Sequence, residues 1–254
     1  PVQAGCTPPM REWKDVIAKA PTGTGKTFAF GIPIIEHIDP ESEEVQAVIM
    51  APTRELAMQI TAELRDLAVF MSGIRVVCLY GGAPIGKQID ALKKKPQIVV
   101  ATPGRLSDHM KRRTVRLDRV QTVVLDEADR MLDMGFVADI KRLLPLLPKS
   151  RQTLFFSATM PADIVALSKS MLTDPVRVEV TPVSSAVDAI DQRVYFVEKP
   201  EKKKLLVSLL REEDKSVLVF SRTKHGADNI SRLLSKSGIR SEAIHGNKSQ
   251  NHRQ

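Results

Sequence analysis

Short apolar runs rich in valine and isoleucine recur along this chain, and they constrain its fold more than any other feature. Six of them, DVIA, AVIMA, RVVCLY, QIVVA, TVVLD and TLFFS, are nearly continuous, which is typical of strands covered on both faces. Helical patterns lie between them, for example at residues 54–70 and 161–172. Because strands and helices alternate, we predict an α/β fold with an open parallel sheet and helices on both sides. Ligands of such folds bind at the carboxyl ends of the strands.

The last quarter of the chain repeats this pattern on a smaller scale. The runs RVYFV and SVLVF read as two more strands, and residues 224–234 have a helical pattern. The stretch TPVSSAVDAIDQ, residues 181–192, lacks a long apolar run and is the best candidate for a linker. We therefore expect a first domain at residues 1–180, a linker at 181–192 and part of a second domain at 193–254.

Charge and composition narrow the classes of protein. The net charge is +8, and residues 193–254 carry 14 Lys and Arg against 7 Asp and Glu, which fits either a polyanion partner or a solvated basic face. The two cysteines and five histidines, including His109, lack disulfide or metal-ligand spacing. No apolar run reaches the ~18 residues of a membrane helix, and the first residues do not resemble a signal peptide. We expect a cytoplasmic protein with no membrane partner.

The segment APTGTGKT, residues 20–27, has the pattern of a phosphate-binding loop between a strand and an apolar helix. Its glycines let backbone N–H groups point at phosphate oxygens, Lys26 can reach the outer phosphates, and the Thr27 hydroxyl can bind Mg²⁺. The first position is Ala20, where the general pattern has glycine, but the residue stays small. A glycine-rich turn without a ligand is the alternative. Pro33 is expected to kink or split the helix that follows. The predicted phosphate-binding residues are Ala20, Thr22, Gly23, Thr24, Gly25, Lys26 and Thr27.

Three carboxylates follow the apolar strand in VVLDEADRML, residues 123–132. Burying such like charges without partners costs several kcal/mol, so a counter-charge is expected nearby, and Lys26 can supply it. Asp126 can hold the Mg²⁺ that bridges nucleotide phosphates, and Glu127 can orient and deprotonate an attacking water. Taken alone, the motif could be an acidic turn that caps a helix. Together with the phosphate loop it predicts nucleotide hydrolysis, with Lys26, Asp126 and Glu127 as catalytic residues and Thr27 and Asp126 as metal ligands.

The DEAD tetrad at residues 126–129 resembles that of the DEAD-box ATP-dependent RNA helicases, and the resemblance extends over nearly the whole chain. The longer run DEADRMLDMGF is close to the family pattern and has a bacterial style. The resemblance implies two RecA-like α/β domains, ATP and Mg²⁺ as cofactors, RNA as partner, and hydrolysis coupled to duplex unwinding or remodelling of RNA–protein complexes. Gln3 is similar to the glutamine with which the family reads adenine.

Further motifs in the family's order carry the rest of the resemblance. PTRELA, GG and TPGR resemble its RNA-backbone motifs, SAT resembles its coupling element, and VFSRT and QNHR resemble the next two motifs. The resemblance thus assigns RNA binding to Pro52, Thr53, Arg54, Gly81, Gly82, Thr102, Pro103, Gly104, Arg105, Arg222, Gln250 and Arg253, and coupling to Asp129, Ser157, Ala158 and Thr159. The guanidinium groups of Arg54 and Arg105 suit phosphate, although structural salt bridges are the alternative. Backbone contacts do not read sequence, so RNA binding should be sequence-independent and sensitive to salt.

The family continues beyond the position of Arg253 with an arginine-rich stretch that stabilises transition-state charge, which this chain lacks. We therefore expect an incomplete second domain and a fragment of poor activity. Two alternatives remain open: an ATP-gated RNA clamp in which unwinding is incidental, and a nucleotide kinase or transporter-type ATPase that never touches RNA. The RNA-backbone motifs weigh against the second. The sequence identifies no protein partner.

Overall fold

A computed structural model describes residues 1–180, 191–248 and 250–253, without the side chains of 250 and 251. The chain divides into two compact units, residues 1–183 and 184–254, which are considered separately. Most of the predicted linker, residues 181–190, lies outside the described residues. No helix in the described ranges is long and apolar enough to cross a lipid bilayer.

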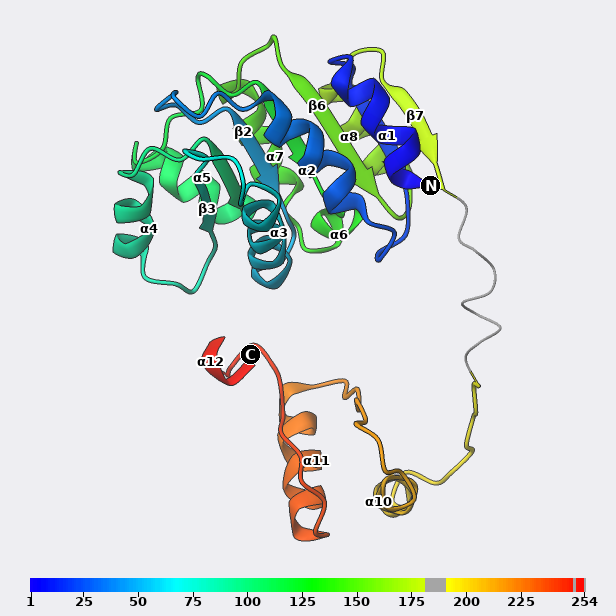
Figure 1. Cartoon of the computed structure of the whole chain (residues 1–254). Helices are drawn as coiled ribbons and strands as arrows, with labels where there is room; N and C mark the ends of the chain where they lie inside the picture. Colours follow the sequence, from blue (N-terminus) through cyan, green and yellow to red (C-terminus); the bar gives the residue numbers. More distant parts are fainter. Residues whose placement is uncertain (181–190, 249, 254) are drawn as a thin grey trace. The chain divides into compact units, whose positions relative to one another are not determined.

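The first unit is built on a seven-stranded parallel sheet with the strand order β3-β4-β2-β5-β6-β1-β7 (Figure 1). All six predicted strands of this unit are present, and β7 is an addition. The strands are β1 (Val16–Lys19), β2 (Ala47–Met50), β3 (Val76–Leu79), β4 (Ile98–Ala101), β5 (Thr122–Leu125), β6 (Gln152–Ser157) and β7 (Val176–Glu179). Four of them, β2, β4, β5 and β6, are buried along their whole length, which explains their continuous apolar sequences.

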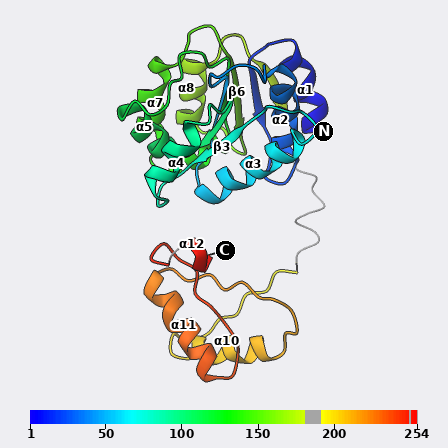
Figure 2. The same cartoon turned by 60° about the vertical axis from the view of Figure 1, so that its left-hand side comes forward.

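Helices cover both faces of this sheet (Figure 2). One face packs against α1 (Val2–Arg11), α2 (Lys26–His37) and α3 (Arg54–Leu67), and the other against α4 (Ile85–Leu92), α5 (Pro103–Lys111), α6 (Ala128–Asp133), α7 (Val137–Leu143) and α8 (Ala162–Met171), with a short 3₁₀ helix at Leu144–Leu146. Successive strand residues alternate between the two cores: Val48 and Met50 belong to the second, and Ile49 belongs to the first. The predicted α/β architecture of this unit is confirmed.

The helix α2 continues through Pro33, so the expectation that the proline would split it is wrong. A proline has no N–H, so the carbonyl of Ala29, four residues earlier, lacks its helical donor. The hydroxyl of Thr7, on the neighbouring helix α1, donates to that carbonyl at 3.3 Å. The neighbouring helix thus supplies a donor for the carbonyl that the proline cannot reach.

The second unit contains α10 (Lys202–Arg211), α11 (Lys224–Lys236) and α12 (Gln250–Arg253). The two strands predicted here, RVYFV and SVLVF, are not formed in the described residues, so this part of the prediction is wrong. Their aromatic side chains are exposed, 97% for Phe196 and 88% for Phe220. An apolar run becomes a strand only when a neighbouring strand takes its hydrogen bonds and a packed layer covers it. Within residues 191–248 and 250–253, no strand pairs with either run, and both aromatic side chains remain uncovered.

Candidate functional site

The predicted phosphate loop connects β1 to α2 at the carboxyl edge of the sheet. Gly23 and Gly25 have φ angles of 81° and 83°, in the left-handed region that favours glycine. Gly25 directly precedes the first residue of α2, so the chain turns sharply into the helix N-terminus. The Gln3 amide donates to the Gly25 carbonyl at 3.3 Å, which brings the predicted adenine reader against the loop. A helix start that follows such a turn is suited to binding phosphate.

Lys26 and Asp126 form a buried pair of opposite charges. Lys26 Nζ lies 3.8 Å from Asp126 Oδ1, and the two side chains are only 6% and 3% exposed. This separation is too long for a hydrogen bond, so the attraction is electrostatic. Burial raises the pKa of Asp126 to about 6, against the opposing effect of Lys26. Thr27, the other predicted metal ligand, is also buried and follows Lys26 at the start of α2.

Glu127 is held from two sides. The Thr22 hydroxyl of the phosphate loop donates to Glu127 Oε1 at 3.2 Å, and Arg130 Nη1 lies 3.3 Å from Oε2. The backbone of Glu127 has a φ of 53°, a left-handed conformation that is costly for a non-glycine residue. Such strain is common at functional sites. Sequence reasoning missed Arg130, although its spacing of three residues along a helix was a usable indication.

Asp129 joins the DEAD segment to the segment after β6. Its carboxylate accepts hydrogen bonds from the backbone N–H and the hydroxyl of Thr159, both at 2.8 Å, and its own N–H donates to Ser157 Oγ at 3.2 Å. Burial alone would raise the pKa of Asp129, but these hydrogen bonds outweigh it and hold the pKa below its usual value. The Ser157 carbonyl accepts from the N–H of Ala20, so the same segment reaches the phosphate loop. Ala158 lies between the two hydrogen-bonding residues.

The three predicted RNA-backbone segments of this unit lie after β2, β3 and β4, which are neighbours in the sheet. Their residues therefore meet at one edge. Arg54 packs against Gly82, where an added Cβ would come within 2.7 Å of Arg54 Nη1. Arg105 donates from Nη1 and Nη2 to the carbonyl of Ala83, both at 3.2 Å. The remaining predicted residues on these segments are Pro52, Thr53, Gly81, Thr102, Pro103 and Gly104.

Two of these residues also shape the helices that follow. Thr53 caps α3 by accepting a hydrogen bond from the N–H of Leu56 at 3.2 Å. Pro103 occupies the first turn of α5, where a proline costs no hydrogen bond. Each segment thus passes from a strand end directly into a helix start, and the backbone of both motifs is fixed locally.

The predicted residues of the second unit lie on two of its segments. Arg222 is exposed and precedes α11, whose N-cap Thr223 accepts from the N–H of Gly226 at 2.9 Å. Arg253 lies on α12, as does Gln250, whose side chain lies outside the described residues.

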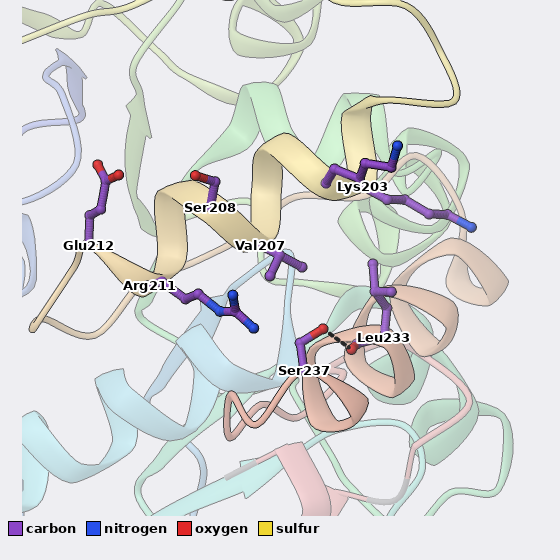
Figure 3. A pocket seen from close by; sticks show the side chains of 8 residues that line it. Lys203, Val207, Ser208, Arg211, Glu212, Leu233 and Ser237 are labelled. Carbon is purple, nitrogen blue, oxygen red and sulfur yellow. Dashed lines mark hydrogen bonds between the residues drawn. The ribbon is translucent and has the colours of Figure 1, made fainter.

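A cavity of about 500 Å³ lies between α10 and α11 of the second unit (Figure 3). It is lined by Lys203, Lys204, Val207, Ser208, Arg211, Glu212, Leu233 and Ser237. None of these was predicted to be functional. The features that suit a nucleotide, left-handed glycines at a helix start beside a buried lysine and carboxylate, belong to the first unit. Among the described residues, no group of three or more His, Cys, Asp or Glu could hold a metal ion.

Comparisons with known proteins agree with this geometry. Residues 1–167 match the family model described as DEAD/DEAH box helicase, and residues 201–254 match that of the helicase conserved C-terminal domain. The chain is 47% identical to the DEAD-box ATP-dependent RNA helicase CshA of Bacillus subtilis, over 98% of this chain and 51% of that protein. Identity to the ATP-dependent RNA helicase CshA of Limosilactobacillus reuteri is 45%, over 100% of this chain and 51% of that protein. The chain thus spans about half the length of these relatives.

A solved structure of a DEAD box protein is also similar to this chain. The crystal structure of a DEAD box protein from the hyperthermophile Methanococcus jannaschii superposes with a TM-score of 0.67 at 36% identity, covering 99% of this chain and 68% of that one.

Proposed function

Because the chain belongs to the DEAD/DEAH box helicase family, we propose that it is part of an ATP-dependent RNA helicase, which couples ATP hydrolysis to local unwinding of RNA duplexes or remodelling of RNA–protein complexes. The observation that carries the proposal is the buried pair of Lys26 and Asp126, with Glu127 beside it, at the same sheet edge as the three RNA-backbone segments. One edge then holds both a nucleotide site and a strand-binding site. Such proximity is what coupling between the two requires.

ATP and Mg²⁺ are the proposed cofactors. Lys26 would pair with the outer phosphates, the glycine turn and the start of α2 would hold their oxygens, and Gln3 would contact the adenine. Asp126 and Thr27 would hold Mg²⁺, which neutralises phosphate charge when it is bound. The pair fits this metal because Mg²⁺ bound with a nucleotide needs only one or two carboxylates from the protein, and Asp126 is a buried carboxylate 3.8 Å from the Lys26 ammonium group.

The residues around this pair have distinct proposed roles. Glu127 would orient the attacking water and accept its proton. Thr22 and Arg130, which contact the two carboxylate oxygens of Glu127, would fix its direction. Asp129, Ser157, Ala158 and Thr159 would relate the nucleotide state to the RNA site through the hydrogen bonds described above.

The proposed RNA interface uses backbone contacts and not base reading. Glycines, hydroxyls and the arginines at 54 and 105 can approach phosphate and sugar, and such contacts position a strand without specifying its sequence. Arg222, Gln250 and Arg253 are the proposed contributions of the second unit. A cytoplasmic location, where RNA and ATP are both abundant, belongs to the same proposal.

An ATP-gated RNA clamp is a second candidate, because the Asp129 to Thr159 hydrogen bonds could report nucleotide binding without any unwinding. Displacement of one strand from a short RNA duplex separates the two functions. The assay uses this chain extended to the length of its relatives, with and without ATP, beside its Glu127→Gln variant. A helicase displaces the strand only with ATP and loses this activity in the variant. A clamp retains RNA in an ATP-dependent manner in both proteins and displaces no strand.

A further inference from the structure

A series of hydrogen-bonded polar side chains, two of them buried, lies behind the predicted RNA-binding edge and is not explained by the roles assigned so far. His109, on α5, is completely buried. Its Nδ1 lies 2.8 Å from Thr114 Oγ1, and its Nε2 lies 3.0 Å from Oε1 of Gln88, on α4. The amide nitrogen of Gln88 in turn donates to the carbonyl of Tyr80 at 2.9 Å. Tyr80 directly precedes Gly81, so this chain of bonds ends at one of the predicted RNA-binding loops.

The direction of these hydrogen bonds is fixed by their last member. The Tyr80 carbonyl can only accept, so Gln88 must present its amide nitrogen there and its oxygen to His109. His109 must then carry a proton on Nε2. Burial lowers the pKa of His109, and the charge of Arg105 lowers it further, which favours a neutral ring with a single proton. Nδ1 is then an acceptor that faces the Thr114 hydroxyl, whose single proton can go either to Nδ1 at 2.8 Å or to the His109 carbonyl at 3.1 Å. The Gln88 amide and the Nε2 proton therefore have one orientation that satisfies both the Tyr80 carbonyl and His109.

A second link joins α5 to the loop at residues 80–83. Arg105 and His109 are four residues apart on α5 and therefore lie on one face of it. Arg105 reaches the Ala83 carbonyl at one end of the 80–83 loop, and His109 reaches Tyr80 at the other end through Gln88. The two links differ in burial: Arg105 is partly exposed, whereas His109 and Gln88 are 0% and 6% exposed.

We propose that His109 and Gln88 are positioning residues that hold the Gly81 and Gly82 loop in the conformation that accepts an RNA backbone. The proposal rests on the RNA-binding function proposed above. When Arg105 turns from Ala83 to a phosphate, the outer link is lost and the buried link keeps the loop in place. The RNA site then stays preorganised while its arginine changes partner, which reduces the ordering cost of binding.

Two substitutions of His109 distinguish the positioning role from a role in which the side chain only fills space in the core. An asparagine amide reaches about as far as Nδ1 of histidine, and a glutamine amide about as far as Nε2. His109→Asn therefore keeps a partner for Thr114 but loses Gln88, whereas His109→Gln keeps the bond to Gln88. Loss of one buried hydrogen bond weakens binding of a short single-stranded RNA by about fivefold or more in His109→Asn, while His109→Gln stays within about twofold of the parent.

The experiment measures RNA affinity by fluorescence anisotropy, ATP affinity by calorimetry and the melting temperature of this chain and both variants. The proposal expects selective loss of RNA affinity in His109→Asn, with ATP affinity unchanged and recovery in His109→Gln. Equal RNA affinity in all three proteins would overturn the positioning role and leave the RNA function intact. Parallel loss of RNA and ATP affinity in His109→Asn would overturn it too, since only the fold would then be affected.

A parent chain that binds ATP but no RNA overturns the RNA function itself, and the positioning role with it. If His109→Asn does not fold, Gln88→Met takes its place, because it removes the donor to Tyr80 while preserving side-chain length. The same selective loss of RNA affinity is expected there, and unchanged RNA affinity would overturn the role.

Discussion

Lys26 Nζ lies 3.8 Å from Asp126 Oδ1 in the interior of the first unit, so the two side chains form a buried pair of opposite charges. A buried pair of this kind contributes little net stability, because desolvation offsets much of the attraction. It does present a cation for phosphate and a carboxylate for a metal at one point. This arrangement is therefore better explained by the proposed nucleotide site than by a contribution to stability.

The raised pKa of Asp126 predicts how nucleotide binding depends on pH. The proposed Mg²⁺ site uses this carboxylate, so below a pKa of about 6 a proton would compete with the metal and the affinity would fall as pH falls. Calorimetric affinity for Mg²⁺-ATP should decrease between pH 7.5 and pH 5.5, by up to about tenfold per unit below the pKa. Asp126→Asn should bind weakly at both pH values, with only the pH dependence that ATP itself contributes. Identical pH dependence in the two proteins would contradict a metal-binding role for Asp126.

Gly82 and Gly81 provide a matched pair of positions in the loop proposed to bind RNA. Gly82 has a φ of 86°, and an alanine there would also meet Arg54 at 2.7 Å, whereas a Cβ at Gly81 has nothing within 4 Å. Gly82→Ala should lower the free energy of unfolding by about 1–3 kcal/mol and Gly81→Ala by less than about 0.5 kcal/mol. Urea denaturation followed through Trp13, the single tryptophan, measures both. Equal effects at the two positions would show that the left-handed turn is unimportant.

Arg105→Gln tests whether the arginine on α5 contacts phosphate. Each phosphate contact with a single strand adds about 0.7 to the slope of log affinity against log salt. The variant should bind single-stranded RNA more weakly and lose about that much slope. Arg112→Gln is the control, because Arg112 is exposed at the other end of the same helix and is bound to Asp108 at 2.8 Å. If both variants lose the same slope, general charge and not a specific contact accounts for the binding.

Asp129 and Thr159 should be energetically coupled. Two charge-assisted hydrogen bonds at 2.8 Å join them, and Thr159→Val removes one. A double-mutant cycle with Asp129→Asn should give a coupling of about 1 kcal/mol in the free energy of unfolding at pH 7. Because the pKa of Asp129 is lowered, this stabilisation is present above the ordinary carboxyl range and is lost as pH falls through the folded pKa.

The control for that cycle is Asp133→Asn, an exposed carboxylate on the same helix. Its coupling to Thr159→Val should be near zero. A comparable coupling at both positions would mean that the two segments interact only through overall charge.

Much of the first unit could be predicted from sequence, for reasons that individual elements make clear. β2 and β4 are buried on both faces, so their apolar runs are continuous and easily recognised. The strand β7 was missed because its valines alternate with Arg177 and Glu179, as expected for a half-covered edge strand. The helix α1 was missed because it contains Pro8 and Pro9, which usually break helices.

Some contacts of the candidate site could be predicted from the sequence, and others could not. The pairing of Asp126 with Lys26 followed from the cost of burying like charges and from a loop pattern that spans consecutive residues. The contact between His109 and Gln88 joins residues 21 positions apart on different helices, and no spacing rule predicts it. The strands predicted at residues 193–197 and 216–220 are not formed, for a related reason. The local sequence shows that a run is apolar, but whether it forms a strand depends on partner strands elsewhere in the chain.

The most direct test of the helicase assignment is ATP turnover by this chain extended to the length of its relatives, measured with and without single-stranded RNA. We predict that RNA of any sequence stimulates turnover and that Glu127→Gln abolishes turnover while ATP binding is retained. Turnover that is unaffected by RNA would contradict the account, leaving a nucleotide hydrolase whose 52–54, 81–82 and 102–105 segments do not serve RNA.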